Sequence, residues 1–115
     1  SWFLEGLAVF VSEGGGAENI TVEQAMAAIR KGLRFEPEDT GKLIPKSAHS
    51  YGLEAHMYYR QAGLFVEYLS KTNPKGFEAA FKDVLNGDSF REVWQKYYGQ
   101  NILELWQSYE KSIRA

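Results

Sequence analysis

The sequence predicts an all-α fold, a compact bundle of about five or six helices, because apolar residues recur at helical spacing along most of the chain. Several of these runs begin at a Ser, Thr or Asn that can cap a helix and end at a glycine. Leu43 and Ile44 are the only strand-like pair, and they are too short to make a strand. We therefore expect residues 1–115 to form a single helical domain or a fragment of one.

The first two helices are predicted over residues 2–13 and 21–33. The first is an apolar segment that the glycine run 14–16 ends. The second begins at Thr21, which has capping-box spacing to Gln24, so that each side chain satisfies a backbone N–H of the other. Its predicted apolar face consists of Val22, Ala25, Met26, Ile29 and Leu33.

Residues 34–50 are predicted to be irregular, because Pro37 and Pro45 interrupt any regular pattern. The acidic side chains at the start of this segment are expected in solvent: Glu36, Glu38 and Asp39. Residues 53–115 should supply the rest of the bundle. They begin with a long helix predicted over 53–71.

Three short aromatic helices should follow the long one. Their predicted caps are Asn73 with Pro74, Ser89 with Glu92, and Asn101 with Glu104. Their apolar stripes are Phe77, Ala80, Phe81, Val84 and Leu85, then Phe90, Val93, Trp94, Tyr97 and Tyr98, then Ile102, Leu105, Trp106, Tyr109 and Ile113. Since the links between them are short, these helices should pack as antiparallel or crossing neighbours.

Composition excludes several classes of function. The chain has 13 basic and 15 acidic residues, a net charge of −2, which argues against the clustered basic field that nucleic-acid binding needs. Without cysteine there is no disulfide, thiolate-bound metal or thiol catalysis. No apolar stretch reaches the roughly 18–20 residues of a membrane span. Phosphate-loop, nucleophile-elbow, EF-hand and His-Glu-x-x-His motifs are absent as well.

Glu5 is the only charged residue in the segment 1–11. If this helix is buried, the carboxylate needs a cation, a metal ion or several hydrogen-bond donors. The alternative is a stripe that faces solvent, since Ser1, Glu5, Ala8 and Ser12 share one side of a helix. The residues alone leave both interpretations open.

Tyr59 lies one helical turn before Gly63. A glycine inside a helix costs about 1 kcal/mol relative to alanine, so we expect something that offsets this cost. Either another backbone comes close to Gly63, or a cavity lies beside the ring of Tyr59. A phenol that faces a cavity can donate a hydrogen bond to a developing oxyanion. The alternative is an ordinary core aromatic near a helix crossing.

The two histidines, His49 and His56, are predicted to be ordinary surface or loop residues. Two helical turns would hold their rings roughly 10 Å apart, which is too far to share one metal ion. One of them could still line a site as a proton donor.

Two segments together resemble the gluzincin zinc metallopeptidases, including the small bacterial peptidase MA-like domains. Residues 2–8 resemble the Trp-x-x-Glu-Gly-x-Ala segment of this clan, and residues 59–69 resemble its downstream helix, which begins with a Tyr. Residues 77–106 resemble the "Gly-x-Ser-Phe-x-x-Ala-Phe … Gly-x-Ser-Leu-x-x-Leu" ending of the peptidase MA-like pattern. Residues 14–50 have no counterpart in this pattern.

The resemblance implies that Glu5 is the third zinc ligand and that Tyr59 stabilises the tetrahedral intermediate of peptide-bond hydrolysis. It further implies a C-terminal helical subdomain, a peptide or protein substrate, and an exported or cell-envelope bacterial protein. The chain lacks the His-Glu-x-x-His helix, hence two metal ligands and the general base. We therefore expect these residues alone to retain no zinc and to have no activity, and the natural protein to continue upstream of Ser1.

A second interpretation is a non-catalytic helical interaction or scaffold module, or a pseudopeptidase. If the chain is instead a fragment of a peptidase, its cut face should leave apolar surface exposed on the first helix, and this surface could support a homodimer. The sequence itself does not fix the compartment.

Overall fold

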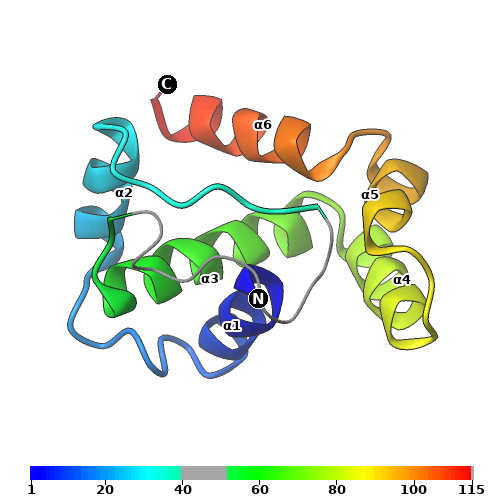
Figure 1. Cartoon of the computed structure of the whole chain (residues 1–115), viewed down its shortest axis with the longest axis horizontal. Helices are drawn as coiled ribbons and strands as arrows, with labels where there is room; N and C mark the ends of the chain where they lie inside the picture. The colour runs from blue at the N-terminus through cyan, green and yellow to red at the C-terminus, as the bar shows by residue number, and fades with distance from the viewer. Residues whose placement is uncertain (40–51, 115) are drawn as a thin grey trace.

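Six helices and no strand make up the part of the chain described by the computed structural model, residues 1–39 and 52–114 (Figure 1). The helices are α1 (Trp2–Val11), α2 (Val22–Arg30), α3 (Ala55–Thr72), α4 (Pro74–Leu85), α5 (Phe90–Tyr98) and α6 (Ile102–Arg114). The all-α prediction is confirmed. Leu43, Ile44, Pro45 and His49 lie outside the described residues.

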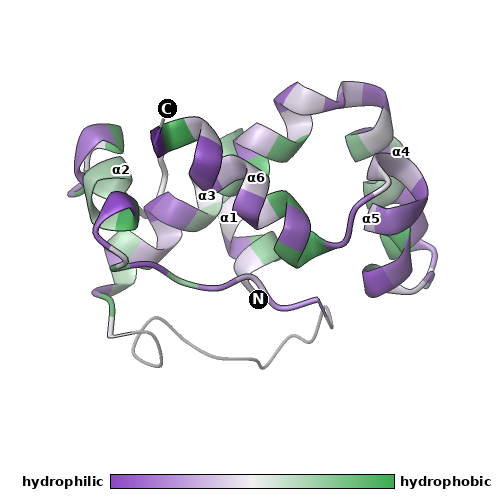
Figure 2. Ribbon diagram, turned by 90° about the horizontal axis from the view of Figure 1, so that it is seen from above, coloured by the Kyte–Doolittle hydropathy of each residue, from purple (hydrophilic) through white to green (hydrophobic). Residues whose placement is uncertain are grey.

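The central element is α3, which packs against α1, α2, α4 and α6. α2 stands at one end of α3, and the paired helices α4 and α5 stand at the other end (Figures 1 and 2). Aromatic rings pack between the helices. The ring centroid of Phe65 on α3 lies 5.3 Å from that of Trp2 on α1 and 5.0 Å from that of Trp106 on α6. The core is thus continuous from the first helix to the last.

α1 and α3 cross with almost no space between their backbones, at a point marked by two glycines. A Cβ atom on Gly6 would lie 2.5 Å from the carbonyl oxygen of Ala62, and one on Gly63 would lie 2.6 Å from Cγ1 of Val9. Both distances are well below the roughly 3.5–4.0 Å of a normal carbon contact. At Gly63 the crowding atoms belong to the Val9 side chain, and the nearest backbone atom of α1, the Gly6 carbonyl oxygen, would lie 3.7 Å from the added Cβ.

Residues 33–39 run across the core as an extended segment between α3 and α6, and we call them the strap (Figure 1). Phe35 and Pro37 are fully buried, and the Phe35 ring packs against Tyr58 of α3 and Trp106 of α6. The prediction of an irregular segment is confirmed for residues 34–39. Of the three acidic residues expected in solvent, Glu36 is exposed, and Glu38 and Asp39 are partly exposed.

Leu33 does not belong to the apolar face of α2, contrary to the prediction. The helix ends at Arg30, and Gly32 then adopts a φ of 84°, a left-handed conformation that suits glycine. Leu33 is consequently outside the helix and 58% exposed. Leu85, predicted in the apolar stripe of α4, is 69% exposed at the last turn of that helix.

Most predicted caps are formed. Thr21 and Gln24 make both bonds of a capping box, and so do Asn101 and Glu104. Asn73 caps α4 ahead of Pro74. Ser89 accepts a bond from the Glu92 amide, which is one half of the predicted pair. α3 starts at Ala55 with Glu54 as its cap, and α1 ends at Val11, two residues short of each predicted boundary.

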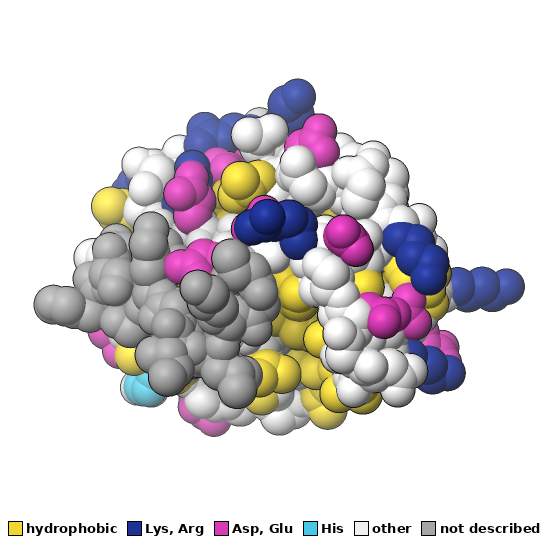
Figure 3. All heavy atoms as spheres, turned by 45° about the vertical axis from the view of Figure 1, so that its right-hand side comes forward, with side chains coloured by type: hydrophobic (Ala, Val, Ile, Leu, Met, Phe, Trp, Pro, Cys, Tyr) yellow, Lys and Arg dark blue, Asp and Glu magenta, His cyan; other side chains and the backbone are white. Residues whose placement is uncertain are grey.

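α1 is buried on one side only, although its sequence is apolar nearly all round. Its outer side exposes Leu4 (47%) and Val11 (73%). Figure 3 shows hydrophobic side chains gathered on one face of the molecule among charged groups. No helix within the described ranges is both long enough and apolar enough to cross a membrane.

Candidate functional site

Glu5 lies in the first turn of α1 and is half-buried. Its Oε2 atom is shielded from solvent and has no hydrogen-bond partner among residues 1–39 and 52–114. Ala8 and Ser12, which share its side of the helix, are exposed. The solvent-facing stripe is therefore interrupted at Glu5, where one carboxylate oxygen is buried without a hydrogen-bond partner from the described residues.

Tyr59 and Glu5 lie on the two helices that cross, each within about one helical turn of the crossing point. Glu5 directly precedes Gly6, and Tyr59 directly precedes the turn that contains Ala62 and Gly63. Tyr59 is half-buried, with its ring centroid 5.8 Å from that of Tyr58. Because the close approach of α1 accounts for Gly63, that glycine gives no support for a cavity beside Tyr59.

The first turn of α1 is tied to the strap by a side chain that sequence reasoning did not single out. The indole Nε1 of Trp2 donates a hydrogen bond to the carbonyl oxygen of Glu38, at 2.9 Å. The ring of Trp2 is buried and packs against Phe35 and Phe65. The strap is therefore bonded to the first turn of α1, the turn that contains Glu5.

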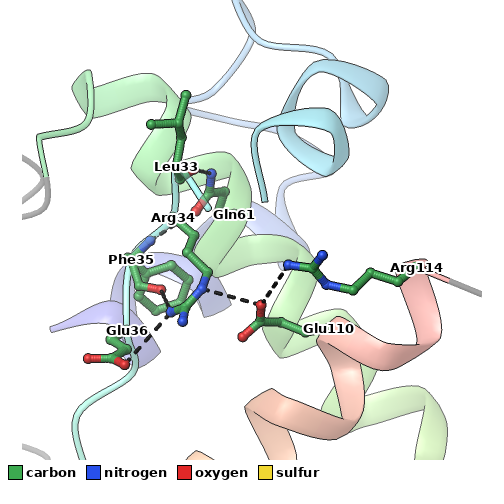
Figure 4. A network of polar contacts seen from close by, with 7 residues as sticks. All are labelled: Leu33, Arg34, Phe35, Glu36, Gln61, Glu110 and Arg114. Carbon is green, nitrogen blue, oxygen red and sulfur yellow. Dashed lines mark hydrogen bonds and ion pairs between the residues drawn. The ribbon is translucent and has the colours of Figure 1, made fainter. Parts of the chain in front are cut away.

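Gln61 of α3 holds the other end of the strap (Figure 4). Its fully buried side chain donates from Nε2 to the carbonyl of Leu33 at 2.9 Å and accepts at Oε1 from the amide of Phe35 at 3.1 Å. The amide thus satisfies two backbone groups that the extended chain would otherwise bury unpaired. The one sequence signal for this role was the position of a polar residue on the apolar face between Tyr58 and Phe65.

A charged network fixes the same end of the strap to the last helix (Figure 4). Arg34 Nε lies 3.3 Å from Glu110 Oε2, and Arg114 NH2 approaches the same oxygen at 3.6 Å. The guanidinium of Arg34 also lies over the ring of Trp106, 5.8 Å from its centroid. These contacts are partly shielded from solvent, so they hold the strap more firmly than surface pairs would.

His56 is placed away from the core, at the start of α3. Its Nδ1 atom lies 3.1 Å from Asn19 Nδ2 and 3.8 Å from a carboxylate oxygen of Glu54. These contacts join the loop after α1 to the first turn of α3. His49 lies outside the described residues, so its predicted role stays a prediction.

Three side chains with shifted pKa values, Asp83, Tyr98 and Tyr109, lie on helices other than the one that carries Glu5. The Tyr97 hydroxyl donates to Asp83 at 2.5 Å, and this bond, helped by Lys96, lowers the pKa of Asp83. Burial raises the pKa of Tyr98 and of Tyr109. The bond between Tyr97 and Asp83 joins α5 to α4. The Tyr98 hydroxyl donates to the Leu69 carbonyl of α3 at 2.6 Å. Both hydrogen bonds stabilise the fold.

Two adjoining hollows of about 580 and 430 Å³ lie along the outer side of α3. Both are lined by Val22, Leu64, Glu67 and Lys71. The first also borders the C-terminal half of α1, and the second borders α6. Their walls are mostly apolar, and neither contains Glu5 or Tyr59.

Within the described ranges, no three His, Asp or Glu residues come together in a way that could hold a metal ion. A buried carboxylate oxygen without a partner has the chemistry of one zinc ligand, while a catalytic site needs three protein ligands. Glu5 therefore fits a single ligand position, and the remaining ligands would have to come from elsewhere. No family model, curated protein or solved structure matches the chain in comparisons with known proteins.

Proposed function

We propose that this chain is the C-terminal helical part of a zinc-dependent metallopeptidase in which Glu5 is a metal ligand. The observation that carries the proposal is the buried Oε2 atom of Glu5, which lacks a hydrogen-bond partner in the described part of the chain. Burying a carboxylate oxygen without a partner is costly, and a buried polar group without a partner calls for an explanation in a native structure. A divalent cation would supply the missing partner, and zinc readily accepts carboxylate oxygen.

The proposal requires two further ligands and a general base from a His-Glu-x-x-His helix outside these 115 residues. The motif resemblance of residues 2–8 predicts this helix, and the outer side of α1 offers an apolar surface for it at Leu4 and Val11. When bound, zinc would polarise the scissile carbonyl and activate water. The part played by this chain is to hold one ligand on a rigid helix.

Tyr59 is proposed to donate its phenolic hydrogen to the oxyanion that forms during hydrolysis. Two facts support this role: Tyr59 lies on the helix that crosses α1 next to Glu5, and its side chain is only half-buried. A neutral phenol is a suitable donor because it need not ionise at physiological pH. Removal of one such donor typically costs about 10²–10³ in kcat.

The first test is made on the protein extended upstream of Ser1 to its natural domain start. We expect stoichiometric zinc and chelator-sensitive cleavage of casein. Glu5→Gln should abolish zinc retention, whereas the matched exposed variant Glu23→Gln should leave it unchanged. Tyr59→Phe should lower kcat by about 10²–10³ with zinc content intact, and Tyr68→Phe on the same helix should not. Normal zinc content in the Glu5→Gln protein would contradict the ligand assignment.

A second test needs no metal and uses the 115-residue chain alone. There, Glu5→Gln replaces a half-buried carboxylate, one oxygen of which is shielded from solvent, with a neutral amide that is less costly to bury, so we expect the free energy of unfolding to rise. Stability would be measured by urea denaturation followed by circular dichroism. A drop in stability would mean that the carboxylate has a stabilising partner, and it would remove the observation on which the proposal stands.

The second candidate function is a non-catalytic helical interaction module. The exposed side chains of Leu4 and Val11 favour it, because apolar patches on a helix are typical of interfaces. A second copy bound through this face would give a homodimer. An extended protein that folds well, holds no metal and cleaves no substrate would select this candidate. Sedimentation of the chain with and without Leu4→Gln would then test the dimer.

A further inference from the structure

We infer that the groove along the outer side of α3 binds a small amphipathic carboxylate, with a hydrocarbon chain in the two adjoining hollows and the carboxylate paired with the guanidinium of Arg60. The hollows, of about 580 and 430 Å³, share Leu64 and Lys71 in their walls. Each volume is within the roughly 300–1,000 Å³ of typical small-molecule sites. Because neither Glu5 nor Tyr59 lines the hollows, the inference does not depend on the proposed metal site.

Arg60 is a cation held in a fixed position in the wall of the larger hollow. Its Nε atom donates to the carbonyl oxygen of Ile20 at 2.8 Å, and its Nη2 atom donates to that of Ala17 at 3.0 Å. Gly14 lines the same hollow, and a Cβ atom on it would lie 3.2 Å from both terminal nitrogens of Arg60. A side chain held in this way loses little further conformational freedom when a ligand binds.

The charge of Arg60 has no ion-pair partner among residues 1–39 and 52–114, where the ion pairs involve other cations. Glu18, in the loop that Arg60 holds, accepts a hydrogen bond from the Gly16 amide at 3.0 Å instead. The segment 40–51 contains no Asp or Glu. The two backbone bonds leave the Nη1 donors of Arg60 available, and a carboxylate is a strong acceptor for such donors.

The other charged side chains of the two walls place the carboxylate at Arg60 rather than elsewhere. Lys71 Nζ lies 2.6 Å from Glu67 Oε1, so these two charges neutralise each other. Glu13 is exposed at the edge of the larger hollow, and its negative charge opposes the binding of an anion. Of the two cations in these walls, Arg60 is therefore the one that a carboxylate ligand would meet without displacing a partner from the described residues.

The walls suit a hydrocarbon chain better than a peptide. Their apolar side chains include Val9, Phe10, Leu64, Met26 and Ile113. The backbone groups of the surrounding helices are bonded within each helix, so they offer no pairing to the N–H and C=O groups of a peptide. From Arg60 to Lys71 the helix rises about 16 Å, which is long enough for the alkyl chain of decanoate.

The test uses the 115-residue chain itself. The ligands are decanoate and decan-1-ol, a neutral molecule with the same chain length. We expect decanoate to bind about tenfold more tightly or better, because only the carboxylate pairs with the guanidinium. Calorimetry would give the affinities, and amide shifts in ¹H–¹⁵N spectra should place the ligand beside Gly14 and Leu64. Equal affinities, or shifts confined to another face, would overturn the inference.

Two charge variants test where the carboxylate lies. Arg60→Gln should weaken decanoate binding by about 10–100-fold and leave decanol binding unchanged. Its matched control is Arg91→Gln, which removes an exposed arginine that pairs with Asp39 on the strap. Glu13→Gln should strengthen decanoate binding by about two- to fivefold at low salt, the effect of one exposed charge. Unchanged decanoate affinity in Arg60→Gln, or weaker binding in Glu13→Gln, would contradict the placement.

Because Arg60 also holds the loop after α1, a further variant leaves this arginine in place. Leu64→Trp fills the point where the two hollows meet, and Leu64 is only partly buried, so the fold should tolerate the larger ring. The variant should abolish binding of both ligands, whereas Leu103→Trp at an exposed position of α6 should not. Undiminished decanoate binding in Leu64→Trp would overturn the inference. Tighter binding of the peptide acetyl-Leu-Phe than of decanoate would assign the groove to a peptide instead.

Discussion

Replacing Gly63 by alanine should destabilise the protein, although alanine is the better helix former. The added Cβ would lie 2.6 Å from Cγ1 and 3.0 Å from Cβ of Val9 on α1. These contacts are about 1 Å shorter than a normal carbon contact at the closest point. Val9 is buried and branched at Cβ, so it cannot rotate away without disturbing its own neighbours.

The expected cost is the difference between two terms. An overlap of this size in a packed interior belongs at the upper end of overpacking penalties, about 3 kcal/mol. Alanine recovers about 1 kcal/mol of helix propensity. The net loss should therefore be about 2 kcal/mol, or a fall in Tm of roughly 8 °C for a chain of this length.

The assay is a double-mutant cycle with Val9→Ala, followed by chemical and thermal unfolding. Val9→Ala removes Cγ1, the atom in closest conflict, so Gly63→Ala should lose most of its cost in that background. Gly6→Ala serves as the contrast. Its Cβ would meet the Ala62 carbonyl oxygen at 2.5 Å, which is backbone, so Val9→Ala should not rescue it.

Equal losses for Gly63→Ala in the two backgrounds would refute the reasoning, because additive effects mean that the two sites do not interact. A rise in the free energy of unfolding on Gly63→Ala in the parent protein would refute the reasoning more directly. It would show that α1 and α3 have room for a methyl group at the crossing.

Three further predictions concern polar groups of the core. Tyr97→Phe should lower stability at pH 7, because the Tyr97 hydroxyl stabilises the Asp83 carboxylate and lowers its pKa. The variant should have little effect well below pH 3.8, where the carboxylate is protonated and this stabilisation is lost. Urea titrations at both pH values would measure the difference. Stability should fall as the pH rises above about 10, since burial raises the pKa of Tyr109 above its value in the unfolded chain. Tyr109→Phe should reduce that alkaline loss and leave stability at pH 7 nearly unchanged, because the hydroxyl has no partner among the described residues. Gln61→Leu should lower the free energy of unfolding by about 1–3 kcal/mol, because it leaves the buried Phe35 amide and the partly buried Leu33 carbonyl without this partner. An unchanged urea midpoint would mean that the strap finds other partners.

Local signals in the sequence predicted the helices well. The capping box at Thr21 and Gln24 spans four residues, and the structure forms both of its bonds. The Asn73 and Pro74 start of α4 is equally local. Such features depend on neighbours along the chain, so a single sequence contains what is needed to find them.

The strap could not be predicted because its environment is assembled from distant residues. Phe35 is buried against Trp106, and the Glu38 carbonyl bonds to Trp2, so neither contact leaves a pattern within residues 33–39. Leu33 was assigned to α2 because its spacing fits a helix. The left-handed turn at Gly32 ends the pattern first.

In the candidate site, too, the sequence predicts features that depend on neighbouring residues and misses those that depend on distant ones. Glu5 could be singled out from the sequence because it is one charge in an apolar run, but the solvent-shielded state of a single oxygen depends on packing across the fold. Gln61 had no local signal beyond its place on an apolar face. Its partners are backbone atoms 26 and 28 residues away.

The bond between Arg30 and the Ile113 carbonyl joins positions 83 residues apart, and it has a consequence for biosynthesis. A ribosome releases α2 and the strap long before it makes α6, which supplies Trp106, Glu110 and Ile113 to cover them. Until then, the ring of Phe35 lacks its packing against Trp106. The nascent chain therefore exposes aromatic surface of the kind that chaperones bind. This core can therefore be completed only after α6 has been translated, and a stop codon before residue 106 would yield a chain prone to aggregate.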